Sequence, residues 1–330
     1  MKPLDRLVAA ARANPRRIAL SDGADPRVIS GALRAMRDGL AEVILVGDED
    51  EIAAALTEQP CGQERPRIED PVRSSRTAVY VETYATLRRA KGVTPDQAAV
   101  AMQNPLTFAT MMVREGAADG TVGGATRTTG ETVRAALQII GQAPGQALVS
   151  SFFLMLLCEP HHTKKGGLIF ADCGLVIEPD AAELAEIAIA SARSYESLTS
   201  EAAKVALLSF STAGSASHQR VEKVVEATRL ARLAAPQIAI EGELQFDAAF
   251  VESIGKAKAP HSTLDGPANV FVFPNLEAAN ISYKIAQRIG GAIAIGPILQ
   301  GLANPANDLS RGCSADDVYH LIATTVVQAR

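Results

Sequence analysis

Six polar residues that could bind an anion or move a proton lie within ten positions near the end of the chain, in the segment DLSRGCSADD (308–317). Arg311 carries a planar guanidinium that matches the oxygens of a phosphate or a carboxylate. Asp317 is a candidate base, and Ser310 offers a hydroxyl. Ser314 and Asp317 are also spaced as a capping box, in which Asp317 only stabilises the start of a helix. Spacing alone leaves both interpretations of Asp317 open.

Two further segments are rich in glycine, serine and threonine: GGATRTTGETVR (123–134) and SFSTAGSAS (209–217). Each follows an apolar run and precedes a helical pattern. The free N–H groups and the positive dipole end at a helix start attract anions, although serine and threonine also occur there simply as caps. The carboxyl ends of strands are where open α/β sheets bind ligands, which favours anion binding. Neither segment is a Walker A loop or a GxGxxG motif, so a nucleotide fingerprint is absent.

The overall composition excludes several classes of protein. The 330 residues carry 32 Lys and Arg against 37 Asp and Glu, a net charge of −5, which disfavours nucleic acid as a partner. No apolar run approaches the ~20 residues of a membrane span. The histidine pair at 161–162 lies beside two lysines, with no carboxylate or cysteine at the spacing of metal ligands. We therefore expect no membrane partner and no metal.

The four cysteines lie far apart and form no CxxC pair. This distribution argues against a disulfide framework or a zinc site and fits a reducing cytoplasm. Buried, unreactive cysteine is the commoner state, so no cysteine is expected to act as a nucleophile. The cysteines are Cys61, Cys158, Cys173 and Cys313.

The elements that would position the three polar segments are short apolar runs that alternate with amphipathic stretches. This alternation predicts an α/β fold with mostly parallel sheets, because parallel neighbours need helical crossovers. The length predicts two domains, with a boundary near residues 143–146. The expected strands are 17–20, 43–46, 119–122, 149–157, 167–171, 205–210, 238–240 and 269–273, and helices are expected over 26–37, 130–140 and 181–192 and from about 314.

Longer stretches give the chain a recognisable family likeness. It resembles the phosphate acetyltransferase (phosphotransacetylase) family over nearly its whole length. The matching stretches include GAADGTVGGATRTTGETVRAALQII, FADCGLVIEPDAAELAEIAI, VALLSFSTAGSA, ANVFVFPNLEAANISYKIAQRIGG and AIGPILQGLANPANDLSRGCSADDVY.

The resemblance implies a fold like that of the isocitrate dehydrogenases, with two α/β/α domains and a cleft between them. The first domain is expected over residues 1–145 plus 297–330, and the second over 146–296. The family is usually a cytoplasmic homodimer. Its members transfer an acetyl group reversibly between acetyl phosphate and coenzyme A (CoA), so CoA, acetyl phosphate and phosphate are the expected partners, with no tightly bound cofactor.

The resemblance also suggests roles for particular residues. Asp317 resembles the base that takes the CoA thiol proton, and Ser310 the group that steadies the developing charge. Arg311 resembles the ligand of the acyl phosphate, with Arg134 beside it. The remaining expected substrate-binding residues are Arg88, which resembles a contact to a CoA phosphate, Lys284, Thr128 and Thr129.

Three alternatives stay open. A phosphate butyryltransferase shares the fold and would be separated by comparing rates with the two acyl phosphates. A non-catalytic sensor of acyl-CoA or acetyl phosphate is disfavoured by the presence of Ser310, Arg311 and Asp317. A dehydrogenase would need a cluster of metal-binding carboxylates and a nicotinamide site, and the sequence contains no sign of either.

Overall fold

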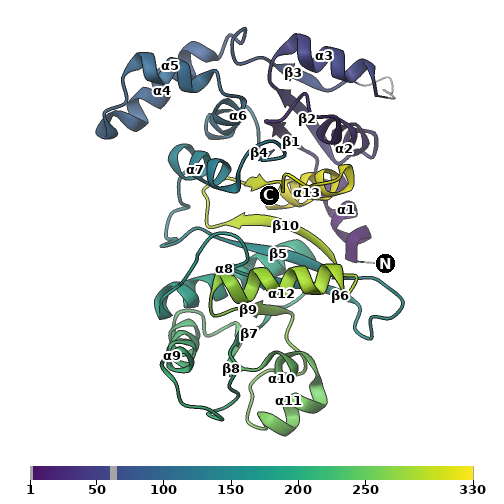
Figure 1. The fold of residues 1–330 in the computed structure, drawn as a ribbon, viewed down its shortest axis with the longest axis vertical. Coiled ribbons are helices and arrows are strands. Elements are labelled where there is room, and N and C mark those ends of the chain that lie inside the picture. Colours follow the sequence, from purple (N-terminus) through teal and green to yellow (C-terminus); the bar gives the residue numbers. More distant parts are fainter. Residues whose placement is uncertain (1–2, 60–64, 330) are drawn as a thin grey trace. The chain divides into compact units, whose positions relative to one another are not determined.

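The computed structural model describes residues 3–59 and 65–329. Cys61 lies outside the described residues. The chain divides into two compact units (Figure 1). The first unit consists of residues 7–144 and 302–330, and the second unit consists of residues 1–6 and 145–301.

A parallel sheet of five strands lies at the centre of the first unit, in the order β11-β4-β1-β2-β3. The strand β11 comes from the end of the chain and pairs with β4. The strands are β1 (Arg16–Leu20), β2 (Ala41–Val46), β3 (Arg67–Glu69), β4 (Gly120–Gly123) and β11 (Ala306–Asp308).

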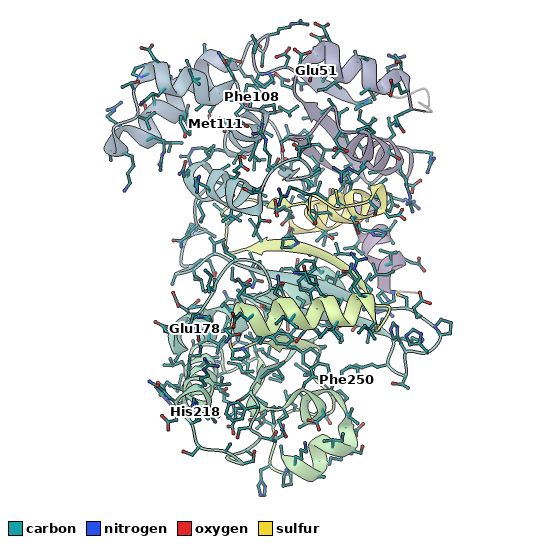
Figure 2. The ribbon with its side chains drawn as sticks, in the orientation of Figure 1. Glu51, Phe108, Met111, Glu178, His218 and Phe250 are labelled. Carbon is teal, nitrogen blue, oxygen red and sulfur yellow. The ribbon has the colours of Figure 1, made fainter. Side chains whose placement is uncertain are left out.

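The helices of this part of the chain begin at the signals that the sequence contains. Pro26 and Pro105 occupy first-turn positions after the caps Asp25 and Asn104. The last helix, α13, is buried along most of its length, and Phe108 of α6 is fully buried (Figure 2). The helices are α1 (Pro3–Ala13), α2 (Pro26–Arg37), α3 (Glu49–Thr57), α4 (Thr77–Arg88), the 3₁₀ turn η1 (Arg89–Lys91), α5 (Pro95–Met102), α6 (Pro105–Arg114), α7 (Thr129–Ile139) and α13 (Ala315–Gln328).

The second unit contains a mixed sheet of six strands in the order β10-β5-β6-β9-β7-β8. The strand β5 is antiparallel to both of its neighbours, and the remaining pairs are parallel. The loop 158–165 between β5 and β6 is too short for a crossover helix, which explains the antiparallel pair. The strands are β5 (Ser150–Leu157), β6 (Gly166–Ala171), β7 (Lys204–Leu208), β8 (Ala239–Leu244), β9 (Val270–Val272) and β10 (Ile293–Gln300).

Phenylalanine side chains fill the core of the second unit. Phe170 lies between Phe271 and Phe273, with ring centroids 5.7 and 5.2 Å away. Residues 297–300, expected in the first domain, belong to β10 in this sheet. The helices are α8 (Ala181–Thr199), α9 (Gln219–Ala234), α10 (Phe246–Phe250), α11 (Glu252–Lys258) and α12 (Leu276–Arg288). The prediction of an α/β fold with mostly parallel sheets is confirmed.

Candidate active site

Two of the three polar segments lie side by side in the first unit. The strands that precede them, β4 and β11, are neighbours, and Gly123 is paired with Asp308. The N–H of Leu309 donates to the carbonyl of Gly123 over 2.6 Å. The helices α7 and α13 therefore begin from adjacent strand ends, and their N-terminal dipole ends act on the same region.

The start of α13 forms the capping box that the spacing predicts. One carboxylate oxygen of Asp317, Oδ2, accepts hydrogen bonds from the N–H and the hydroxyl of Ser314, both over 2.8 Å. The Ser314 hydroxyl in turn accepts from the Asp317 N–H over 3.2 Å. The half-buried Asp317 makes no further side-chain hydrogen bond within residues 3–59 and 65–329. Capping therefore uses one oxygen and leaves Oδ1 available to accept a proton.

The start of α7 forms a second capping box. Thr128 donates its hydroxyl to Glu131 Oε2 over 2.8 Å and accepts from the Glu131 N–H over 3.3 Å. The Thr129 hydroxyl donates to Asp308 Oδ2 over 2.6 Å. Both hydroxyls expected to bind substrate are thus already bonded within the protein.

Asp308 is a fully buried carboxylate between these two segments. Its Oδ1 has no hydrogen-bond partner among the described residues. Burial raises the pKa of Asp308 to about 6, and the charge of Asp22 raises it further. A side chain at Gly124, whose φ is +103°, would place its Cβ 2.2 Å from Asp308 Oδ1, so glycine is required there.

We expect Asp308→Asn to change how stability depends on pH. A carboxyl whose pKa rises from about 3.9 unfolded to about 6 folded stabilises the fold below pH 4 and loses that contribution as the pH rises through 6. The wild-type free energy of unfolding should fall by roughly 3 kcal/mol more than that of the variant between pH 4 and 7. Urea titrations over that range measure it; parallel pH curves would contradict the assignment.

Asp22, which follows β1, takes the backbone donors that were expected to hold a substrate anion. Its carboxylate accepts from the N–H groups of Gly124, Ala125 and Thr126 over 2.9, 3.3 and 3.2 Å, and from the Thr126 hydroxyl. The anion bound by this turn is therefore a side chain of the protein. Sequence reasoning missed Asp22, although its place after an apolar strand is the signal used for the other segments.

Arg27 joins the two segments and was also missed. Its guanidinium donates to the carbonyls of Arg311 and Cys313 over 2.8 and 3.2 Å and to the carbonyl of Ala125 over 3.1 Å. Asp25 holds the same guanidinium through two hydrogen bonds. Because most of its donors are used in this way, Arg27 positions the segments and has little capacity left for a substrate.

Two exposed arginines lie at these helix starts. The guanidinium of Arg311 makes no hydrogen bond or ion pair to the described residues, and neither does that of Arg134 on α7. Ser310, also exposed, accepts weakly from the Gly312 N–H over 3.3 Å. Two cations and a hydroxyl beside two helix N-termini form a site for an anion such as a phosphate.

Two other predicted site residues are not joined to this group. Arg88 ends α4, which Figure 1 draws beside α5 and apart from α13, and its buried Nε has no partner among the described residues. Lys284 belongs to α12 of the second unit, where it donates to Asn280.

The third polar segment, 209–217, follows β7 in the second unit. Its turn is also organised by a carboxylate of the protein, because Glu243 accepts from the Ser211 hydroxyl over 2.7 Å and from the Gly214 N–H over 2.9 Å. Over the described ranges, no group of three His, Cys, Asp or Glu side chains could hold a metal ion. No helix there is both long and apolar enough to cross a membrane.

Burial raises the pKa of the Cys313 thiol and, more strongly, that of Cys173. A raised pKa keeps a thiol protonated at neutral pH, and the thiolate is the nucleophile. Both thiols therefore resemble core residues rather than reactive groups, which agrees with the expectation from the sequence.

A model of one protein family covers nearly the whole chain: residues 3–326 match the family described as phosphate acetyl/butaryl transferase. Among curated proteins, a phosphate acetyltransferase from Paracoccus denitrificans is 52% identical over 330 residues, covering 100% of both chains. A phosphate acetyltransferase from Acetivibrio thermocellus is 45% identical, covering 100% of this chain and 99% of the relative.

Solved structures give the same likeness. The EutD phosphotransacetylase from Staphylococcus aureus superposes with a TM-score of 0.89 at 42% identity, covering 99% of both chains. A 4-hydroxythreonine-4-phosphate dehydrogenase from Klebsiella pneumoniae reaches a TM-score of 0.55 at 14% identity, covering 96% of this chain and all of its own, a likeness of fold alone.

Proposed function

Because the chain belongs to the phosphate acetyl/butaryl transferase family, we propose that the adjacent starts of α7 and α13 form the site of acetyl transfer between acetyl phosphate and CoA. The chain is a phosphate acetyltransferase, an acyltransferase, as the expected family and reaction required. The observation that carries the placement is Asp317, whose second carboxylate oxygen is unused, one turn after Ser310 and Arg311.

In the proposed mechanism, Asp317 Oδ1 takes the proton from the CoA thiol. The sulfur then attacks the carbonyl carbon of acetyl phosphate, and the C–O bond to phosphate breaks as the thioester forms. Both substrates are bound together, so no acyl-enzyme is needed. Full transfer of a proton from a reference thiol (pKa about 8.5) to a reference aspartic acid (about 3.9) is uphill by roughly 6 kcal/mol. The helix dipoles and the two arginines lower this cost by stabilising the thiolate.

The other proposed roles follow from charge. Arg311 and Arg134 hold the phosphoryl group, and the Ser310 hydroxyl donates to the oxygen that gains charge on the carbonyl. Arg88 and Lys284 are proposed as further contacts to the phosphates of CoA. Thr128 and Thr129 contribute through the α7 N–H groups, since their hydroxyls are bonded to Glu131 and Asp308.

The activity is tested by following thioester absorbance with purified protein, CoA and acetyl phosphate. A rate with acetyl phosphate that exceeds the rate with butyryl phosphate supports acetyl as the substrate group. The opposite preference would assign the chain to the butyryl branch of the family. Absence of thioester formation with either would contradict the function.

We expect Cys313→Ala to keep at least about half of the wild-type turnover, because CoA brings the reacting thiol and the pKa of Cys313 is raised by burial. Steady-state rates per folded molecule measure this. Mass-spectrometric detection of an acetylated Cys313 during turnover, together with ping-pong kinetics, would contradict direct transfer.

We also propose that the enzyme is a homodimer in the cytoplasm. Three isoleucines form a stripe at four-residue spacing on α12: Ile281, Ile285 and Ile289 are 58%, 53% and 83% exposed. Together with Ile177, also exposed, they are apolar surface that a second copy would cover. No disulfide forms among Cys158, Cys173 and Cys313, which agrees with a reducing compartment.

Ile285→Asp should therefore shift the protein toward a monomer. Losing a buried isoleucine on both sides of a two-fold interface costs roughly 3 kcal/mol or more, over a hundredfold in Kd. Sedimentation velocity measures the mass, with Val225→Asp on α9 as the control at another exposed apolar position. An Ile285→Asp dimer as tight as that of the control would contradict the interface.

A further inference from the structure

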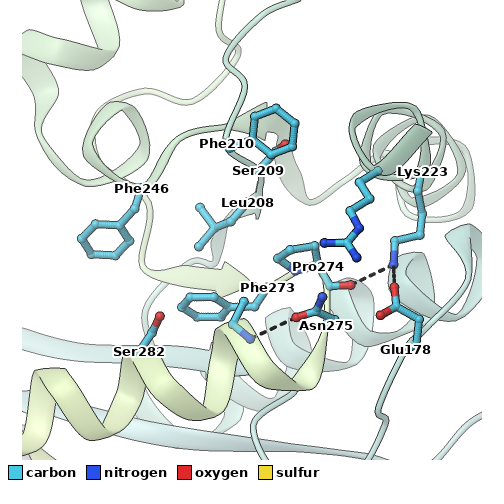
Figure 3. A pocket seen from close by; sticks show the side chains of 12 residues that line it. Glu178, Leu208, Ser209, Phe210, Lys223, Phe246, Phe273, Pro274, Asn275 and Ser282 are labelled. Carbon is cyan, nitrogen blue, oxygen red and sulfur yellow. Dashed lines mark hydrogen bonds and ion pairs between the residues drawn. The ribbon is translucent and has the colours of Figure 1, made fainter. Parts of the chain in front are cut away.

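A pocket of about 400 Å³ lies in the second unit, apart from the residues of the proposed acetyl-transfer site (Figure 3). It opens where β7 and β9 end and where α9 and α12 begin. These are the carboxyl ends of parallel strands, the usual position of ligand sites in α/β sheets. Its volume is in the range of small-molecule sites.

One side of the pocket is apolar and aromatic. Figure 3 shows Leu208, Phe246 and Phe273 grouped on this side. Phe246 is held from behind by Phe250, with nearly parallel rings 5.4 Å apart, and by Phe271 at 5.2 Å. Phe210 also lines the pocket and leaves 58% of its surface exposed. The pocket therefore presents aromatic surface to a ligand.

The other side of the pocket carries positive charge. Lys223 donates to Glu178 over 2.6 Å and to the carbonyls of Pro179 and Pro274 over 3.0 and 2.9 Å (Figure 3). This hydrogen bond is the main cause that lowers the pKa of Glu178. Arg220, one turn earlier on α9, is exposed, and its guanidinium makes no hydrogen bond or ion pair in the described part of the chain. Lys223 is thus fixed, whereas Arg220 has its donors available.

The two helix starts add to the positive potential. Arg220 is the second residue of the 16-residue α9, and Asn275 caps the 13-residue α12 by accepting from the Ala278 N–H over 3.0 Å. Both helices direct the positive ends of their dipoles toward the region of the pocket that Arg220, Lys223 and Asn275 line. A ligand with a flat apolar group and an anionic group fits both sides.

We infer that this pocket binds the phosphorylated adenosine end of CoA, with the adenine against the exposed phenylalanine rings and the 3′-phosphate on Arg220. The inference rests on the proposed function, which makes CoA a substrate. Aromatic side chains stack on bases, and a free guanidinium matches a phosphate. An acetyl group is far smaller than the pocket and would leave its cations unused. Free adenine nucleotides share this chemistry, so the experiment must separate the two sources.

The main test compares Arg220→Met with Arg229→Met, a control on the same helix whose guanidinium is exposed and paired with Glu226. Arg220→Met should raise KM for CoA at least about tenfold, because a charged hydrogen bond is lost. Its KM for dephospho-CoA, which lacks the 3′-phosphate, should stay within about twofold, as should kcat. The control should match the wild type with both substrates.

A second measurement does not depend on activity. Calorimetry should detect binding of adenosine 3′,5′-bisphosphate to the wild-type chain and a loss of at least about tenfold in affinity in Arg220→Met. Phe210→Ala should weaken binding of CoA and dephospho-CoA alike, because stacking does not depend on the 3′-phosphate.

Two outcomes would overturn the inference. The first is an unchanged KM for CoA in Arg220→Met. The second is tighter binding of 5′-AMP or ATP than of the 3′,5′-bisphosphate, which would assign the pocket to free nucleotides. In either case wild-type thioester formation would leave the proposed function standing. Bisphosphate binding that depends on Arg220, in a chain without transferase activity, would instead show that the proposed function had failed alone.

Discussion

Asp317→Asn is expected to fold normally and to lose roughly 10²–10⁴ in turnover, the contribution typical of a general base. The asparagine keeps a carbonyl oxygen that can accept from the N–H and hydroxyl of Ser314, so the cap at the start of α13 survives in large part. What disappears is the basicity of the second oxygen. Initial rates with saturating CoA and acetyl phosphate measure the loss, and KM for either substrate should change little.

Asp316→Asn is the matched control. Asp316 lies one residue earlier on the same helix, is exposed and forms an ion pair with Arg34. Exposed ion pairs contribute little to stability, so this variant should resemble the wild type in both rate and stability. The remaining activity of Asp317→Asn should rise with pH as solvent removes the thiol proton. A variant that is less stable but has normal turnover per folded molecule would show that Asp317 is only a cap.

The local signals in the sequence predicted the helix starts well. The capping boxes Thr94–Gln97 and Ser314–Asp317 are present as their spacing indicated. Such motifs depend on hydrogen bonds within one turn, so three residues contain all the information required. The capping and catalytic interpretations of Asp317 are compatible for the same reason, because a carboxylate has two oxygens and the cap uses one.

The sequence could not show how distant segments meet. The pairing of Gly123 with Asp308 places two helix starts next to each other, and the register of a parallel pair depends on the whole sheet. Asp22 and Arg27 then lock these segments together through backbone groups of residues far away in the chain. Backbone donors and acceptors are present at every residue, so such partners leave little trace in residue type.

The same limit explains the second unit. The strand β5 was expected from its apolar run, but its antiparallel pairing with β10 depends on a strand 140 residues later that was not predicted. The pocket beside β7 likewise collects side chains from α9, α10 and α12. Of the three polar segments, only the two in the first unit are joined by hydrogen bonds in the described residues.

Arg311→Lys is expected to reduce kcat/KM for acetyl phosphate by about 10- to 100-fold, although the charge is kept. The wild-type guanidinium has its donors free, and a planar fork can bond two phosphate oxygens at once, whereas an ammonium acts as a point charge. Losing one hydrogen bond to a charged group costs about 1.5–3 kcal/mol. The effect should appear with acetyl phosphate and with phosphate in the reverse direction, but not in KM for CoA.

Arg37→Lys is a suitable control, because Arg37 is an exposed arginine of the same unit paired with Asp38 and distant in sequence from both segments. It should be indistinguishable from the wild type. Arg134→Lys should show a milder form of the Arg311→Lys defect if both guanidinium groups hold the phosphoryl group. Since the Arg311 carbonyl, and not its side chain, accepts from Arg27, the substitution leaves the link between the segments intact. Near-normal kinetics toward acetyl phosphate in Arg311→Lys would therefore rule out bidentate phosphate binding rather than report a misfolded site.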